Sequence, residues 1–176
     1  MNRLLVFFIA LFLLPSCKNL VPYTDALRQS NGWSDDQMKK IQFYTSDAVV
    51  LQRKLSSEST EIVDGKIKME NGQRIEEVII RERTPGVLVG FPRDKAMSIS
   101  FEKSDDYFLK FGQNPNQNNR YCLLASEWTN RRGKVKYHGK DFTTSASGAE
   151  VFLMVDLRKL RKEDVNMRVA KGRKVN

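Results

Sequence analysis

Apolar and polar residues alternate with a period of two in many short segments of the chain. In the clearest segment, apolar Met97, Ile99 and Phe101 are separated by Ser98 and Ser100. Because successive side chains of a strand point to opposite faces, this alternation predicts a strand with one buried face. Nothing in the sequence resembles a regular alternation of strands and long helices. The pattern predicts a mainly β fold, either an antiparallel sandwich or a small barrel.

Turn residues separate these segments. Asp64-Gly65, Asn71-Gly72 and His138-Gly139 have the composition of two-residue hairpin turns, and Pro85-Gly86 is predicted to turn the chain into the next strand. The predicted strands cover residues 41–44, 48–51, 61–63, 66–69, 75–83, 87–91, 97–101, 107–111, 121–128, 134–137, 141–144, 151–157 and 165–169. Among the predicted strands, residues 151–157 have the composition most typical of a buried strand.

A short helical segment, residues 24–41, precedes the strands. Thr24 is placed to cap a helix over 25–30, which Asn31-Gly32 would end. Ser34 and Gln37 have the spacing of a capping box, and they predict a second helix over 35–41. The apolar residues expected to dock this segment onto the main body are Trp33, Met38 and Ile41.

The first residues have the three parts of an export signal. Arg3 is followed by an unbroken apolar run of eleven residues, 4–14, and the run ends at Leu14, Pro15, Ser16 and Cys17. As a helix this run would measure only ~16 Å, at ~1.5 Å per residue. A bilayer core is ~30 Å thick, so the run is too short to cross it.

Leu14, Ser16 and Cys17 resemble the lipobox of bacterial lipoproteins, although Pro15 departs from the residue usual at its position. The resemblance implies that residues 1–16 are a signal peptide removed by signal peptidase II. Cys17 would then carry diacylglycerol and a palmitate-type acyl chain, and residues 17–23 would form a lipidated tether. The alternative is an ordinary secretory signal with a cysteine near its end. Such signals favour a small residue at the position of Leu14.

The residues after Cys17 bear on location. Lys18 stands where an aspartate would retain a lipoprotein in the inner membrane, and residues 18–23 contain no acid. Surface lipoproteins of the Bacteroidota type carry an acidic cluster at this point. The resemblance therefore implies an outer-membrane lipoprotein that faces the periplasm.

Positive charge is concentrated near the C-terminus. The 176-residue chain has a formal net charge of +9, and residues 130–176 hold thirteen Lys and Arg against five Asp and Glu. This asymmetry indicates an anionic neighbour: a lipid headgroup, an envelope glycan or an acidic protein surface. Nucleic acid is not expected as a partner of an exported lipoprotein. The alternative is a solvated, lysine-rich edge that prevents wrong strand pairing. The candidate contact residues are Arg158, Lys159, Arg161, Lys162, Arg168, Lys171, Arg173 and Lys174.

Candidate catalytic chemistry is sparse. With Cys17 acylated, Cys122 and His138 are the only cysteine and histidine left. A zinc site needs three or four ligands, so no metal or cofactor is expected. Glu76 and Glu77 are adjacent on a predicted strand and would point to opposite faces, which disfavours a catalytic pair. The sequence therefore predicts a protein that is not an enzyme.

Residues 42–176 are expected to form one β-rich domain, with a possible internal boundary in the polar segment 113–120. The leading hypothesis is an outer-membrane lipoprotein that serves as an accessory or structural subunit of a cell-envelope assembly and binds a protein partner. The alternative is a periplasmic module that binds an anionic envelope glycan or lipid through its basic C-terminal region.

Overall fold

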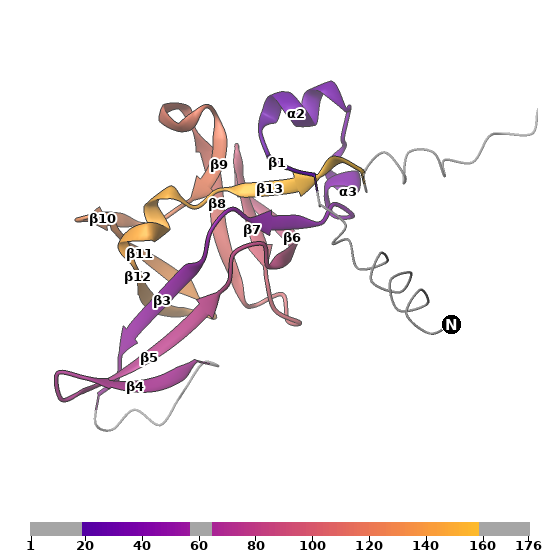
Figure 1. Ribbon diagram of the computed structural model, residues 1–176. Helices are drawn as coiled ribbons and strands as arrows, with labels where there is room; N and C mark the ends of the chain where they lie inside the picture. Colours follow the sequence, from indigo (N-terminus) through magenta and orange to yellow (C-terminus); the bar gives the residue numbers. More distant parts are fainter. Residues whose placement is uncertain (1–18, 57–64, 159–176) are drawn as a thin grey trace, which may run out of the picture.

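The computed structural model describes residues 19–56 and 65–158, and it shows two antiparallel sheets in a sandwich-like arrangement that is not a closed barrel (Figure 1). The first sheet has the strand order β1 (Leu20–Pro22), β13 (Leu153–Asp156), β2 (Phe43–Thr45), β6 (Pro85–Arg93), β7 (Ala96–Ser100), β8 (Phe108–Asn114) and β9 (Arg120–Leu123). The second has the order β10 (Glu127–Thr129), β11 (Arg132–Tyr137), β12 (Lys140–Thr144), β3 (Val49–Lys54), β5 (Gln73–Ile80) and β4 (Lys66–Glu70). The mainly β prediction is confirmed.

Two of the predicted hairpin turns are confirmed. Asn71-Gly72 connects β4 to β5, and His138-Gly139 connects β11 to β12. All four residues have a positive φ, between 46° and 73°, as a two-residue turn of this kind requires. Asn and Gly tolerate this left-handed conformation best, so the turn sequence specifies the register of the flanking strands.

The helical segment forms as predicted at its start and ends earlier than predicted. Helix α2 (Asp25–Ser30) begins after Thr24, whose hydroxyl accepts the Leu27 N–H at 3.1 Å. Helix α3 (Asp35–Met38) has the full capping box, but it is only one turn long instead of reaching residue 41. After Met38 the backbone continues in tighter turns, in which the Lys40 N–H donates to the Gln37 carbonyl at 3.0 Å and the Ile41 N–H to the Met38 carbonyl at 3.2 Å. Ile41 still reaches the core, where it is 3% exposed.

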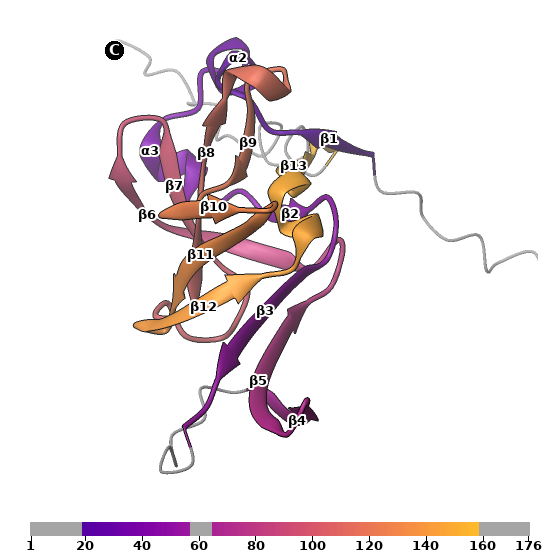
Figure 2. The same ribbon diagram turned by 90° about the vertical axis from the view of Figure 1, so that its left-hand side faces the viewer.

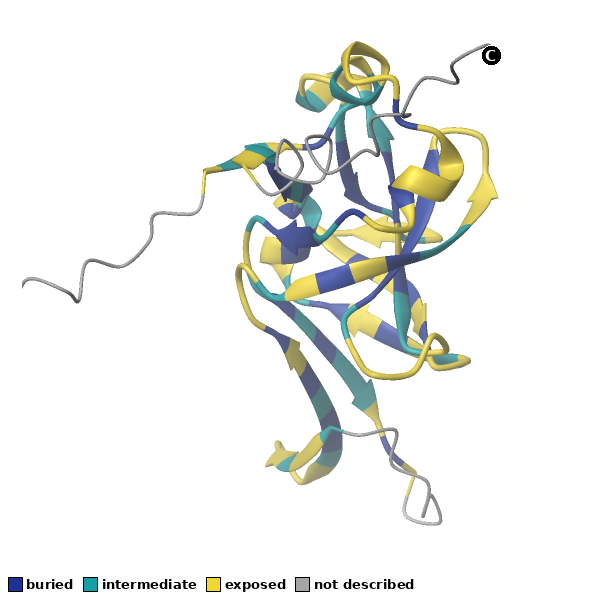
Figure 3. Cartoon of the chain, turned by 90° about the vertical axis from the view of Figure 1, so that its right-hand side faces the viewer, coloured by how far each residue is buried: buried dark blue, intermediate teal, exposed yellow. Residues whose placement is uncertain are grey.

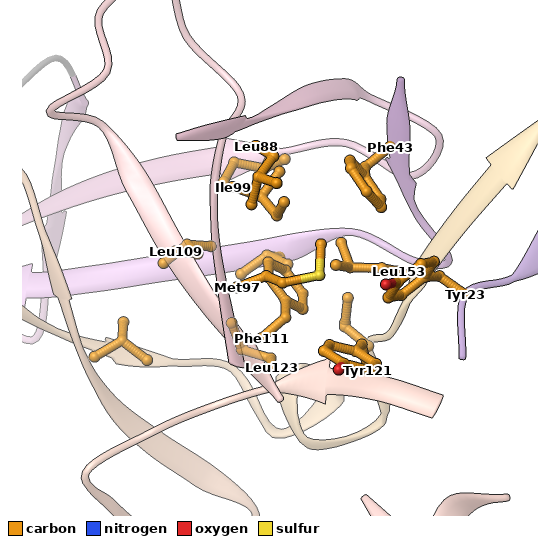
Figure 4. Packing of buried hydrophobic residues seen from close by; sticks show 14 of the residues in the cluster. Tyr23, Phe43, Leu88, Met97, Ile99, Leu109, Phe111, Tyr121, Leu123 and Leu153 are labelled. Carbon is orange, nitrogen blue, oxygen red and sulfur yellow. The ribbon is translucent and has the colours of Figure 1, made fainter. Parts of the chain in front are cut away.

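The core lies between the two sheets and continues under the helical segment. It includes Leu109 of the first sheet and Val135 and Phe142 of the second, together with Trp33 and Met38, as predicted. Figure 4 shows part of this cluster. Along β11, exposed and buried residues alternate strictly, and the same banding is visible on other strands in Figure 3. One core therefore joins both sheets.

The prediction of a half-buried strand at residues 97–101 is wrong. All of β7 is buried, including Ser98 and Ser100, and Phe101 lies just outside the strand. Burial of the second face is tolerated because the serines are small and the Ser100 hydroxyl donates to the carbonyl of Ser104 at 2.9 Å. Alternation of serine with apolar residues therefore does not mark a solvent-facing side here.

Two further predicted boundaries need correction. Pro85-Gly86 is part of β6 rather than a turn, because both residues pair with β2. A Cβ on Gly86 would lie 2.6 Å from the Phe101 ring, so glycine is needed there for close packing. The predicted strand 121–128 is two strands, β9 and β10, and residues 124–126 carry the chain from the first sheet to the second.

The polar segment 113–120 connects β8 to β9 through the 3₁₀ turn Pro115–Gln117. Gln113 pairs with Tyr121 across this connection, and the core cluster contains residues from both sides of it. Hydrogen bonding and packing thus continue across the segment considered as an internal boundary. The predicted strands 61–63 and 165–169 lie outside the described residues, as does Asp64 of the predicted turn.

The predicted tether, residues 17–23, is corrected from Leu20 onward. Leu20–Pro22 is strand β1 at the edge of the first sheet, and Tyr23 is fully buried. The short apolar stretch carried no alternation by which it could be recognised as a strand. It becomes a strand because it pairs with β13 in an antiparallel register.

Candidate membrane-proximal site

The first and last described strands are neighbours, which brings the two ends of the described chain together. Strands β1 and β13 are antiparallel, with Leu20 opposite Asp156 and Pro22 opposite Met154 (Figure 1). In the sequence, Cys17 precedes Leu20 by three positions, and Arg158 follows Asp156 by two. Cys17, the predicted attachment point, and the start of the basic C-terminal sequence are therefore both connected to one corner of the first sheet, through Leu20 and Asp156.

An aromatic cluster holds β1 in place. The Tyr23 ring lies edge-on to Phe43, with ring centres 5.4 Å apart, and to Tyr121, with ring centres 4.8 Å apart. The Tyr23 N–H donates to the Leu153 carbonyl at 2.8 Å, and the Tyr121 N–H donates to the Tyr23 carbonyl at 3.3 Å. Figure 4 shows these side chains converging. Residue 23, six positions after the predicted lipid attachment, is thus fixed in the core.

Polar contacts tie helix α2 to the same cluster. The Tyr121 hydroxyl donates to Asp25 Oδ1 at 2.6 Å. Burial raises the pKa of Tyr121, and the hydrogen bond to Asp25 raises it further, so the phenol remains a donor. Arg28 Nη2 lies 2.5 Å from Asp35 Oδ1, and its guanidinium lies over the ring of Phe91. These contacts connect helix α2 to Tyr121 of β9, to the start of helix α3 and to Phe91 of β6.

Of the eight predicted contact residues, Arg158 lies within the described part of the chain. Arg158 is exposed, and its N–H donates to the buried Asp156 carboxylate at 3.0 Å. Outside the described residues lie Cys17, Lys159, Arg161, Lys162, Arg168, Lys171, Arg173 and Lys174. The structure thus places Arg158 at the corner where β1 begins, and the grouping of the other basic residues stays a prediction.

Cys122 and His138 have different neighbours. The buried Cys122 thiol lies 3.2 Å from Gln117 Oε1, and burial raises its pKa, which disfavours the reactive thiolate. The His138 ring stacks on Tyr107, with ring centres 4.2 Å apart. Within residues 19–56 and 65–158, no group of three His, Cys, Asp or Glu residues could hold a metal ion.

Glu76 and Glu77 point to opposite faces of β5. Glu76 is fully buried and lies 2.5 Å from Arg53 Nη2. Glu77 Oε2 accepts hydrogen bonds from Lys68 at 2.6 Å and Gln52 at 2.7 Å. These hydrogen bonds, that from Lys68 first, lower the pKa of Glu77. Each carboxylate therefore pairs with a different cation, Glu76 with Arg53 and Glu77 with Lys68.

Sequence reasoning missed a basic cleft of about 380 Å³ beside residues 124–126. Its cationic side chains belong to Arg93, Lys110, Lys134 and Lys136. They are spread over more than forty positions of sequence, and two of them lie outside the basic C-terminal quarter. Counting charges along the sequence does not reveal this group of cations, because only strand pairing brings the four residues together.

Comparison of the chain with known protein families, with curated proteins and with solved structures found no match. None of the helices in the described part of the chain has the length and apolar character needed to cross a membrane.

Proposed function

We propose that the chain is a non-enzymatic, lipid-anchored protein of the bacterial outer membrane, held on the periplasmic face as an accessory or structural subunit of an envelope assembly. The observation that supports this most is the position of β1. This strand begins three residues after Cys17 and is hydrogen-bonded into the first sheet. Three residues span at most ~11 Å at ~3.6 Å each. The lipid would therefore hold the domain close to the bilayer.

A short connection suits a subunit better than a freely searching binder. A long flexible tether lets a domain explore a large volume, whereas a short one confines it near the surface. Tyr23 fixes the first strand in the core, so motion between anchor and domain is restricted to very few residues. The folded part would be presented to a partner at nearly constant height above the membrane.

Replacing Cys17 with alanine tests the anchor. Cys17→Ala is expected to abolish incorporation of labelled palmitate and to move the protein from the outer-membrane fraction to a soluble or uncleaved form, because the acyl chains provide the membrane affinity. Cell fractionation and mass spectrometry of the mature N-terminus measure both effects. Cys122→Ala is the matched control and should remain lipidated and membrane-bound. An unlipidated wild-type Cys17 would overturn the proposal.

The subunit role has its own readout. Mild-detergent purification of the tagged full-length protein should recover stoichiometric envelope proteins, identified by mass spectrometry. Recovery of lipidated wild-type protein alone would contradict the subunit role while leaving the anchor intact.

A second candidate function is binding of an anionic envelope glycan or lipid through the basic C-terminal region. The register of β1 and β13 favours it, because this register places Arg158 at the corner where the chain from Cys17 enters the sheet. Reversing the charge of Arg158, Lys159, Arg161 and Lys162 is expected to weaken sedimentation with peptidoglycan or anionic vesicles several-fold at low salt. The difference should shrink as salt is raised. Unchanged sedimentation, with weaker recovery of proteins, would favour a protein partner instead.

A further inference from the structure

The basic cleft lies where the chain crosses from the first sheet to the second. Residues 124–126 form its wall, and they are hydrogen-bonded to both sheets. The Leu124 N–H donates to the Lys110 carbonyl at 2.8 Å, and the Ser126 N–H donates to the Lys134 carbonyl at 2.9 Å. The wall is therefore held in place without a ligand, so binding would require little ordering of the protein.

Strand pairing brings two of the cations to one face of the first sheet. Arg93 is opposite Ala96, and Lys110 is opposite Ser98. Ala96 and Ser98 are two positions apart on β7, so all four side chains project to the same side. Both long side chains thus extend past small neighbours. Neither cation forms an ion pair with any residue of the described ranges, 19–56 and 65–158.

Strand β11 supplies the other two cations. Lys134 Nζ lies 2.7 Å from Glu127, and Lys136 Nζ lies 3.7 Å from Asp141. These pairs are largely exposed and therefore weak, so both ammonium groups stay able to contact a ligand. Asp141 is the one carboxylate among the cleft's lining residues, against four cations. The cleft therefore favours an anion.

Apolar residues also line the cleft. Leu124 packs against Gly112, where an added Cβ would lie 2.8 Å from its Cδ1 atom. Val135 is 6% exposed and belongs to the core cluster, and Ala125 packs against that cluster. A cleft lined by both cationic and apolar residues matches a ligand that has an anionic group next to an apolar portion.

We propose that this cleft binds a phosphate ester carried on an apolar chain. Arg93 and Lys110 would contact the phosphate oxygens, because guanidinium and ammonium groups form charge-assisted hydrogen bonds with phosphate. The half-buried Leu124 and Ala125 would contact the apolar portion. The source is either the headgroup region of a membrane phospholipid or a soluble phosphorylated amphiphile. The proposal depends neither on Cys17 nor on the basic C-terminal residues.

Titration of the full-length protein in phosphatidylcholine nanodiscs with short-chain dihexanoyl phosphatidic acid tests the cleft. Trp128 is 40% exposed and packs against Gly133 beside Ala125, so its fluorescence reports on the cleft wall. The combined Arg93→Glu and Lys110→Glu variant is expected to bind the probe at least about tenfold more weakly than wild type. Glycerol 3-phosphate, which lacks the apolar chains, should also bind at least about tenfold more weakly.

The matched control combines Lys40→Glu with Arg81→Glu. It makes the same charge change at two exposed positions that do not line the cleft. It should bind like wild type, and thermal melting should show all variants folded. Failure of wild type to bind the probe, equal affinity of the cleft variant, or an equal loss in the control would each overturn the proposal.

A further titration distinguishes the two sources. Nanodiscs that contain phosphatidic acid should lower the apparent affinity for the soluble probe if the cleft reaches its own bilayer. Undiminished affinity in those discs would assign the cleft to a soluble amphiphile.

Discussion

Glu76→Ala is expected to lower the free energy of unfolding by about 3–5 kcal/mol, because the substitution removes the fully buried carboxylate that pairs with the mostly buried Arg53 guanidinium. Glu76 is fully buried, and its Oε2 accepts hydrogen bonds from Arg53 Nη2 at 2.5 Å and Nε at 3.1 Å. The Arg53 side chain is 17% exposed and lies over the Phe142 ring. Urea denaturation of the full-length protein, followed by circular dichroism, measures the change.

The neighbouring carboxylate is the control for this prediction. Glu77→Ala removes a partly exposed carboxylate from the other face of β5, where Lys68 is 38% exposed. The expected loss in the free energy of unfolding is about 1 kcal/mol or less, since solvent screens the ion pair between Lys68 and Glu77. Replacing Arg53 with Met and Glu76 with Leu together should recover most of the stability lost in Glu76→Ala, because both charges of the pair are then replaced by apolar side chains. Equal losses in Glu76→Ala and Glu77→Ala would contradict the argument.

Local sequence rules predicted the elements whose structure is decided by a few neighbouring residues. The Asn71-Gly72 and His138-Gly139 turns, the Thr24 cap and the Ser34–Gln37 capping box all occur where the sequence places them. Each depends on conformational preferences or side-chain hydrogen bonds within four residues. Such features are present in the sequence itself, so no knowledge of the rest of the fold is required to find them.

Features decided by distant contacts were not predicted. Strand β7 is buried on both faces, the face of Ser98 and Ser100 included. Strand β1 exists because residues 20–22 pair with β13. The two short strands within 121–128 belong to different sheets. In each case the deciding partner lies elsewhere in the sequence, and binary patterning does not encode which partner it is.

The candidate sites differ in the same way. The predicted attachment at Cys17 is a contiguous motif, and sequence alone suggests it. The register of β1 and β13, which brings the end of the described chain to the same corner, required the structure. Finding the basic cleft also required the structure, because Arg93 and Lys110 come to one face of the sheet only through pairing with β7. Charge counted along the chain identified a C-terminal excess and overlooked this group.

Tyr23→Ala is expected to lower the free energy of unfolding by about 3–5 kcal/mol, a typical cost of truncating a large buried aromatic residue. The Tyr23 side chain is fully buried and packs edge-on against Phe43 and Tyr121. Its loss would leave a cavity at the point where β1 enters the core. Thermal and urea unfolding of the full-length protein measure the loss, and amide hydrogen exchange in β1 should increase more than exchange in β11.

Tyr23→Phe separates packing from hydrogen bonding at this position. It keeps the ring and removes a hydroxyl that lies 3.7 Å from the Met38 sulfur, a weak acceptor. The expected loss is about 1 kcal/mol or less. If Tyr23→Phe cost as much as Tyr23→Ala, the hydroxyl and not the aromatic cluster would hold β1. If neither variant changed exchange in β1, Tyr23 would not be what fixes this strand, and the argument that a lipid on Cys17 holds the domain at constant height would lose its structural basis.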